Sequence, residues 1–416
     1  MRLAFGFVLF TVAALAADTF PFELKTAGGV VAQIEIRSPG ADWAVAGREA
    51  AVAVMQSDGG VPHHVILYGG ETVTPYRVFL GQFDAGKHTL SVTRDETHSA
   101  AGTGVEVNSV HFEKFGQFDP EASAPVLFAR KNTVGKFSDV PTIVYCEKLQ
   151  SDKSTYLQYS AIYSNEDGGT SSRALMARWG RTTDIEYMYR VYLDASGKPG
   201  PAIIQGPNHV DTEWAGPMEG FHPLLMPVTN NNTFGPSDGT SPLRFQIAPI
   251  FVNLSVASRE SVMDRYPVTW TVMAKELVRE NKLRPFGTVD GEKISDPRNY
   301  LYVDYSAAND GTALAVRVRL TDGREFASDL GQLTFGIDRT GWVRTTVELP
   351  AATRRAQIEA IGFQCKLKRP ESSGSCEVRG LSGAFFLNAQ GRPEEPILRE
   401  VPRTGVAAGE TFWHKL

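Results

Sequence analysis

The chain has 416 residues, with 42 basic and 47 acidic side chains and a formal net charge of −5. Both signs are interspersed, and this mildly acidic balance argues against nucleic acid or an anionic membrane surface as a partner. A hydrophobic content of 42% and an aromatic content of 10% exclude a disordered chain, and the length favours two domains.

The N-terminus predicts export. Arg2 precedes an apolar stretch, Leu3 to Leu15, that has the length of a signal-peptide core and is too short to span a bilayer as a helix. Ala14-Leu15-Ala16 matches a small-x-small cleavage site. We interpret residues 1–16 as a signal peptide, with an N-terminal membrane anchor as the alternative. The mature protein is then secreted or periplasmic and no longer attached to a membrane.

Residues 17–118 show the pattern of an accessory β-sandwich. Six short runs carry β-branched or aromatic residues at every second position, and turn sequences such as Asp58-Gly59-Gly60 separate them. The stretch YRVFLGQFDAGKHTLSV is similar to hairpins of small accessory sandwiches on extracellular enzymes, including carbohydrate-binding ones. This resemblance concerns architecture and implies no particular ligand.

A polar, proline-bearing segment then predicts a domain boundary, and residues 119–416 predict a larger β-sandwich or jelly-roll-like domain. Strand patterns run through it, including ALMARWG at 174–180. We therefore expect a mainly β fold, with an N-terminal antiparallel β-sandwich followed by this larger domain. The missing alternation of strands and helices argues against Rossmann-like and TIM-barrel folds.

The period becomes helical only at 258–281, which predicts a short helical insertion. Ser261 and Asp264 resemble a capping box, and Pro267 suits the first turn of a second helix. The residues expected on one buried helical face are Trp270, Met273, Leu277 and Val278.

The three cysteines have different surroundings. Cys365 and Cys376 flank a polar segment that resembles a hairpin loop, and an oxidising compartment permits a disulfide there. The spacing alone leaves this pairing open. Cys146 lies in an apolar run, which favours a buried, inert thiol.

A first polar cluster lies between Tyr163 and Tyr192. Glu166 and Asp167 precede two glycines, a pattern typical of a hairpin turn, with a carboxylate at a cleft edge as the functional alternative. In a strand, Asp184, Glu186 and Arg190 share one face, which is also typical of a plain exposed sheet face.

A second polar cluster spans residues 205–232. His209, Asp211 and Glu213 face one way in an extended segment, and with His222 they have ligand types that suit a metal. The alternatives are polar loop residues without a ligand, proton transfer, or hydrogen bonding to a substrate. The pattern is short, so we assign no metal site. We also expect no cofactor, because the chain has no P-loop, dinucleotide fingerprint or H-E-x-x-H motif.

The first hypothesis is a secreted carbohydrate-active enzyme, either a glycoside hydrolase or a polysaccharide lyase, that acts on an extracellular polysaccharide or oligosaccharide. Carboxyl groups and a histidine supply acid and base, while tryptophan stacks on sugar rings and arginine binds carboxylate or hydroxyl pairs. The catalytic candidates are Glu166, Asp167, Asp184, Glu186 and His209, and the substrate-binding candidates are Arg178, Trp179, Arg181, Asp211, Trp214 and His222.

Two other hypotheses remain open. The alternative is a non-catalytic exported protein that binds a glycan or another partner through a platform of Trp179, Trp214 and Tyr187. The third is a metal-dependent hydrolase. The enzymatic hypothesis requires that segments 163–190 and 205–232 meet in one solvent-lined depression.

Overall fold

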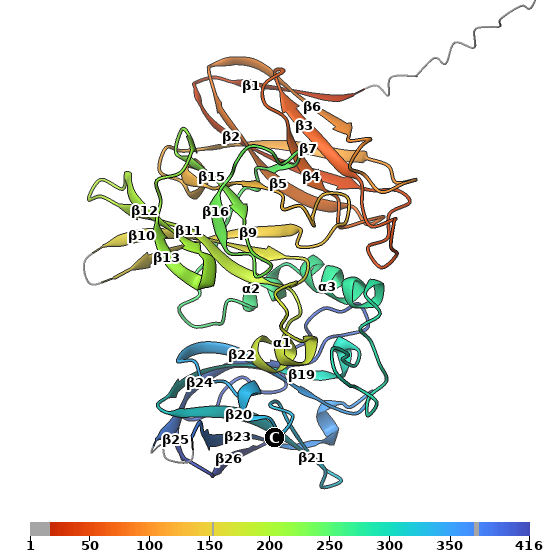
Figure 1. The fold of residues 1–416 in the computed structure, drawn as a ribbon, viewed down its shortest axis with the longest axis vertical. Coiled ribbons are helices and arrows are strands. Elements are labelled where there is room, and N and C mark those ends of the chain that lie inside the picture. The colour runs from red at the N-terminus through yellow and green to blue at the C-terminus, as the bar shows by residue number, and fades with distance from the viewer. Residues whose placement is uncertain (1–16, 152–153, 370–373) are drawn as a thin grey trace, which may run out of the picture.

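The computed structural model describes residues 17–151, 154–369 and 374–416, and the predicted signal peptide lies outside them. These residues form six sheets, in which all strand pairs except β8–β15 and β9–β18 are antiparallel, with a few short helices, so the predicted mainly β fold is confirmed. Figure 1 shows three tiers, with the N-terminal strands at one end, the C-terminal strands at the other and the helices between the middle and C-terminal tiers.

The N-terminal tier is a sandwich of two antiparallel sheets, with strand orders β1-β6-β3-β4 and β5-β2-β7. The period-two pattern fixes which side chains face inward. On β2, for example, Ile34 and Ile36 are fully buried while Glu35 between them is exposed. The strands are β1 (Asp18–Leu24), β2 (Gly28–Arg37), β3 (Val52–Ser57), β4 (His63–Ile66), β5 (Thr74–Phe83), β6 (Gly86–Arg94) and β7 (Glu106–Phe115).

The middle tier contains a six-stranded sheet of order β13-β12-β11-β10-β9-β18 and a smaller sheet of order β14-β15-β8-β17, with β16 paired to β15. Its strands are β8 (Val126–Phe128), β9 (Pro141–Gln150), β10 (Thr155–Tyr163), β11 (Ile185–Leu193), β12 (Pro199–Gly206), β13 (Val210–Glu213), β14 (Met218–Glu219), β15 (His222–Pro227), β16 (Phe234–Pro236), β17 (Arg244–Phe245) and β18 (Ile250–Phe251).

The N-terminal and middle tiers share one buried apolar cluster, which runs from β2 to α3. Backbone bonds also cross between them, since the amide of Phe79 donates to the carbonyl of Gln246 at 3.0 Å. The cluster therefore crosses the boundary predicted near residue 118. Whether the two sides are independent domains stays a prediction.

Three helices fill the space between the middle sheet and the C-terminal tier (Figure 1): α1 (Ser172–Trp179), α2 (Ser261–Arg265) and α3 (Val268–Arg279). The strand predicted at 174–180 is wrong, because these residues form most of α1. Ser171 caps its start by accepting from the amide of Ala174, and Gly180 ends it in the left-handed conformation. Short apolar runs do not distinguish a strand from a helix, and Ala, Leu, Met and Arg favour the helix.

The helical insertion predicted at 258–281 is confirmed, but two of its details are wrong. No capping box forms at Ser261, because Asp264 instead pairs with Arg344 at 2.6 Å. Trp270, Met273 and Leu277 are buried as expected, whereas Val278 is 52% exposed.

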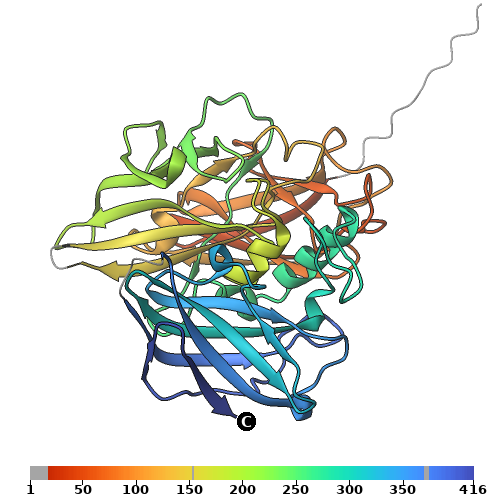
Figure 2. The same ribbon diagram turned by 60° about the horizontal axis from the view of Figure 1, so that its bottom comes forward.

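The C-terminal tier is a second sandwich, with strand orders β22-β19-β24-β25 and β21-β20-β23-β26 and its own apolar core. Figure 2 brings these strands forward. They are β19 (Tyr300–Asn309), β20 (Thr312–Leu320), β21 (Glu325–Ala327), β22 (Gly341–Glu348), β23 (Ile358–Leu367), β24 (Ser375–Phe385), β25 (Thr404–Ala407) and β26 (Thr411–Lys415).

A disulfide joins Cys365 on β23 to Cys376 on β24, with their Cα atoms 5.7 Å apart. These strands belong to different sheets, so the bond ties the two layers together and the expected hairpin is wrong. Residues 370–373 of that segment lie outside the described residues. Cys146 is buried, as predicted, and burial raises the pKa of its thiol. In the described parts of the chain, no helix has both the length and the apolar character needed to cross a membrane.

Candidate active site

The middle sheet brings several of the predicted acids together. Asp184 immediately precedes β11 and Glu186 is its second residue, so the two carboxyls lie two positions apart in extended backbone. Both raise the pKa of Tyr163, which ends the neighbouring strand β10, although burial of its hydroxyl is the larger cause. The ends of β10 and β11 therefore place these groups in one interior region.

Arg190 lies outside the interior region that holds Asp184 and Glu186. Tyr187 pairs with Ser160 whereas Tyr189 pairs with Tyr159, so Met188 is an extra residue that breaks the alternation along β11. The Arg190 guanidinium bonds Gln158 at 2.7 Å and lies 3.4 Å from Asp211. The predicted face shared by Asp184, Glu186 and Arg190 is wrong for this reason.

Burial changes the protonation of the acids. Desolvation raises the pKa of Glu186 to about 7, with the Asp184 charge as the next cause. The same two causes raise the pKa of Glu166 to about 7, and burial also raises the pKa of Asp184. These three carboxyls cannot all ionise at low cost near neutral pH, because like charges in a desolvated site repel one another.

Arginines oppose these shifts without removing them. Arg181 is 1% exposed and lies 3.9 Å from Asp184, but its guanidinium is also 3.3 Å from Glu260. Arg259 lowers the pKa of Asp184, Glu186 and Glu260 and lies 3.5 Å from Glu260. The positive charge is shared among several acids, so the cluster retains an excess of carboxyl groups.

His209 connects the buried acids to the surface. Its side chain is 47% exposed, and its Nδ1 lies 3.8 Å from Glu186 Oε2. The amide of Gln205 bonds both groups, donating to Glu186 at 2.7 Å and contacting the His209 ring, while Asn231 Nδ2 lies 2.6 Å from His209 Nε2. Asn208 and His209 adopt left-handed backbone, with φ of 59° and 58°, an uncommon conformation for these residues.

The two polar segments meet here. A Cβ placed on Gly168 would lie 2.6 Å from Asn231 Oδ1 and 3.0 Å from Glu166 Oε1, so the 165–169 loop packs closely on Asn231. With the contacts of His209, this forms a continuous set of residues that we call the acid–base site. It consists of Glu166, Asp184, Glu186, Gln205, His209 and Asn231.

Three buried polar atoms around the acid–base site have no hydrogen-bond partner in the described part of the chain: Tyr163 Oη, Gln205 Oε1 and Asn232 Oδ1. Asn232 is otherwise fixed, because its amide donates to Asp184 at 3.0 Å and to Asp139 at 3.2 Å. Buried polar groups usually have partners, and these three atoms are shielded from solvent. Tyr163 and Asn232 are not distinguished by the sequence pattern, although the run Asn230-Asn231-Asn232 is visible in it.

Asp167 has a different position from Glu166. Its carboxylate accepts hydrogen bonds from Asn132 at 3.0 Å, Ser138 at 2.8 Å and Asn165 at 3.0 Å. Its charge also helps to raise the pKa of Asp139 to about 7, after burial as the larger cause. These contacts fit Asp167 as a residue that fixes the loop.

Most of the predicted substrate-binding residues lie apart from the acid–base site. The Trp179 ring is contacted by Arg178 and Arg339, each 5.0 Å from its centroid. Arg178 also lies 3.5 Å from Asp338, at the contact between α1 and the C-terminal tier. Arg181 is buried and holds acids, as described above.

The others lie on separate parts of the middle tier. Asp211 contacts the Tyr187 hydroxyl and Arg190. Trp214 donates to the sulfur of Met218. His222 stacks on Phe79 with centroids 4.7 Å apart and bonds the carbonyl of Ala124. Asp211, Glu213 and His222 therefore do not converge on His209, and the described residues hold no group of three or more His, Cys, Asp or Glu side chains placed to bind a metal ion.

No family model matches the chain, and no curated protein matches it. The structure of NLPPya in complex with mannosamine matches 41% of this chain and 80% of its own, at 11% identity and a TM-score of 0.24. A ruminal GH26 endo-beta-1,4-mannanase matches 33% of this chain and 28% of its own, at 10% identity and a TM-score of 0.19. The alpha toxin from Clostridium absonum matches 36% of this chain and 41% of its own, at 14% identity and a TM-score of 0.19. Likenesses this distant and partial carry no argument about function.

Proposed function

We propose that the protein is a secreted carbohydrate-active enzyme, a glycoside hydrolase or polysaccharide lyase, that uses the acid–base site on an extracellular glycan. One observation carries this proposal. Two glutamates whose pKa values are raised to about 7, Glu166 and Glu186, flank the same buried Asp184, and the half-exposed His209 lies beside Glu186. Acids tuned toward neutral pH at one position are a property of proton-transfer sites.

Hydrolysis of a glycosidic bond needs one protonated carboxyl and one ionised carboxylate. Two interacting carboxyls that both titrate near neutral pH supply this combination, because ionisation of the first disfavours ionisation of the second. In this role one of Glu186 and Glu166 protonates the glycosidic oxygen, and the other, ionised, activates the attacking water or attacks the anomeric carbon itself. Asp184 is 1% exposed, so it acts as the charge that tunes them.

Elimination at a uronate would use the site differently. A base removes the proton from the carbon that carries the sugar carboxylate, the bond from the adjoining carbon to the glycosidic oxygen breaks to leave a C=C double bond, and an acid protonates the departing oxygen. Positive or protonated groups stabilise the charge that develops on the carboxylate. His209 is the exposed base at this position, with Glu186 beside it as a protonated partner. The two reactions therefore differ in which residue acts as the base.

Incubation with a panel of neutral and acidic polysaccharides tests the proposal, with reducing ends and unsaturated products measured separately. Glu186→Gln keeps the shape of the side chain and removes its proton transfer, so we expect at least a ~100-fold loss of turnover, as for the loss of a general acid or base. Glu213→Gln, at an exposed acid on β13, is the matched control and should keep full activity.

The two product types separate hydrolase from lyase. His209→Gln should abolish unsaturated products if elimination occurs and should weaken hydrolysis less. Full activity of Glu186→Gln, or no product from any polysaccharide, would contradict the proposal. Calorimetric binding of a glycan without turnover would instead support the non-catalytic alternative.

A further inference from the structure

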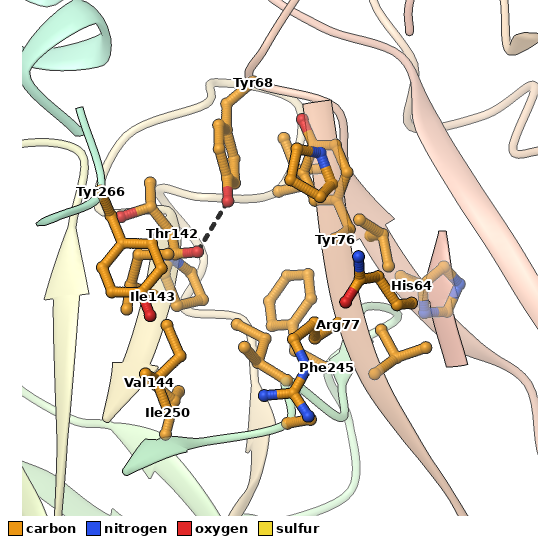
Figure 3. A pocket seen from close by; sticks show the side chains of 18 residues that line it. His64, Tyr68, Tyr76, Arg77, Thr142, Ile143, Val144, Phe245, Ile250 and Tyr266 are labelled. Carbon is orange, nitrogen blue, oxygen red and sulfur yellow. Dashed lines mark hydrogen bonds between the residues drawn. The ribbon is translucent and has the colours of Figure 1, made fainter. Parts of the chain in front are cut away.

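A hollow lies at the contact between the N-terminal and middle tiers, and none of the residues of the acid–base site line it. Its volume is about 280 Å³, nearly twice that of the ~150 Å³ protein cavity known to bind benzene. Figure 3 shows side chains of both tiers around it, from β4 and β5 on one side and from β9 and β18 on the other. We call it the seam cavity.

The walls of the seam cavity are mainly apolar and aromatic. Tyr68, Tyr76, Phe245 and Tyr266 contribute rings. Val144 is 1% exposed, whereas Tyr266 and Ile250 are partly buried. A flat apolar molecule held among these side chains gains contacts on several sides, which is the usual construction of a small-molecule site.

The polar groups of the seam cavity define the rest of the ligand. The side-chain amide of Gln33 lines the cavity and makes no hydrogen bond within the described residues, so it can donate and accept. The Arg77 guanidinium also lines it, but lies 3.3 Å from Glu113 and 3.8 Å from Glu121. Two carboxylates already face this one cation. An anionic ligand would be repelled by them, whereas a hydroxyl or carbonyl group would not.

We propose that the seam cavity binds an uncharged aromatic molecule of about two rings that carries a hydroxyl or carbonyl group. The rings pack among Tyr68, Phe245 and Tyr266, and the polar group bonds Gln33 and Arg77. The volume of the seam cavity sets the size of the ligand, and the aromatic walls set its flat shape. The two glutamates near Arg77 exclude an anion. This proposal does not rest on the acid–base site, which uses none of these residues.

Titration calorimetry of the full mature chain with 2-naphthol tests it. We expect saturable binding at one site. Ile250→Trp puts a larger side chain into the lining of the cavity and should weaken binding at least ~tenfold, a loss of about 1.4 kcal/mol. Leu333→Trp is the matched control, because Leu333 is 37% exposed and lies in the C-terminal tier. It should bind as the unchanged protein does.

Two further arms keep the result interpretable. Gln33→Leu keeps an apolar wall but removes the amide, and should weaken 2-naphthol binding roughly three- to tenfold, as expected for one hydrogen bond. At pH 8, 2-naphthoate has the same rings with a negative charge and should bind more weakly than 2-naphthol. Melting temperatures show whether each variant is folded.

Either of two results would overturn the assignment to the seam cavity. One is that the unchanged protein shows no saturable binding of 2-naphthol. The other is that the folded Ile250→Trp and Gln33→Leu variants both bind 2-naphthol as tightly as the unchanged protein does. Equal or tighter binding of 2-naphthoate would overturn the uncharged class of ligand. Binding of 2-naphthol to Glu186→Gln should be unchanged, so failure of the acid–base site and failure of this proposal are distinguishable.

Discussion

Glu186 and Glu260 are both buried, at 7% and 3% exposed, yet their pKa values move in opposite directions. Desolvation raises the pKa of Glu186 to about 7. Desolvation opposes ionisation of Glu260 as well, but Arg259, Arg181, Arg339 and Arg344 together hold its pKa at about 2. Burial alone therefore does not decide whether an acid of this protein is protonated. The number of nearby cations decides the direction of its pKa shift.

The two regions also have different partners. Glu260 precedes α2 and faces the arginine-rich contact with the C-terminal tier, where Arg344 binds Asp264 at 2.6 Å and Asp304 at 3.0 Å. The acid–base site shares Arg181 and Arg259 with that contact and has His209 at its surface. The acids at the contact with the C-terminal tier are therefore paired with arginines, whereas the acid–base site has more carboxyl groups than nearby cations.

Removing the cation of the paired region should have the largest effect. Arg344→Met leaves Asp264 and Asp304 without their buried partner, so we expect a loss of about 3–5 kcal/mol in the free energy of unfolding. Denaturant unfolding at neutral pH measures it. Arg324→Met, which breaks the exposed pair with Asp322, is the control and should leave the free energy of unfolding nearly unchanged, because solvent screens the pair. An equally small loss for Arg344→Met would show that the contact is not stabilised as described.

Glu260→Gln breaks the paired region from its acidic side. The folded pKa of Glu260, about 2, is below its ordinary value of 4.5, so its contribution is present above pH 4.5 and is lost as the pH falls toward 2. A shift of this size corresponds to roughly 3 kcal/mol. The variant should be less stable at pH 7 and should lose less stability on acidification. An unchanged acid limb of the stability profile would contradict the paired role of Glu260.

Glu186→Gln should change the free energy of unfolding in the opposite direction, toward greater stability. The folded pKa of Glu186 is about 7, above its ordinary value of 4.5. The folded protein keeps a proton that the unfolded chain releases, so stability falls as the pH rises from 4.5 through 7. Removing the carboxyl should add stability at pH 8, by roughly 3 kcal/mol, and almost none at pH 4. Thermal unfolding at both pH values measures this, and a destabilised variant at pH 8 would refute it.

The smallest effect should come from an exposed acid of the same sheet. Asp211 lies 3.4 Å from Arg190 with a side chain 51% exposed. Solvent screens such pairs, so Asp211→Asn should change the free energy of unfolding by less than ~1 kcal/mol. A larger change would show that this exposed pair stabilises the protein as strongly as the buried ones do.

The fold was largely predictable because period-two alternation survives in exposed and half-buried strands. The strand prediction for ALMARWG was wrong because the periodicity of a short apolar run does not distinguish a strand from a helix. The helix is fixed instead by the cap at Ser171 and by Thr346 of β22, whose hydroxyl donates to the carbonyl of Met176. The partners of Glu260 were also beyond sequence analysis. Arg344 lies 84 residues from Glu260, and its guanidinium bonds the Glu260 carbonyl.

The acid–base site was predictable in part. Asp184 and Glu186 are two residues apart, so local geometry alone places them together. The contact between Gly168 and Asn231 depends on tertiary structure, and so does the position of Arg190, which an extra residue in β11 moves out of register. The aromatic and arginine residues near 178–181 looked like a sugar platform, but Trp179 is occupied by arginine contacts.

Infrared difference titration of the carboxyl groups in the unchanged protein and in Glu186→Gln tests the central claim most directly. We predict protonated-carboxyl absorbance that persists above pH 6, titrates near pH 7 and is reduced in the variant. If every carboxyl group of the folded protein is already ionised by about pH 5.5, well above the ordinary range for Asp and Glu, the acid–base site as described does not exist.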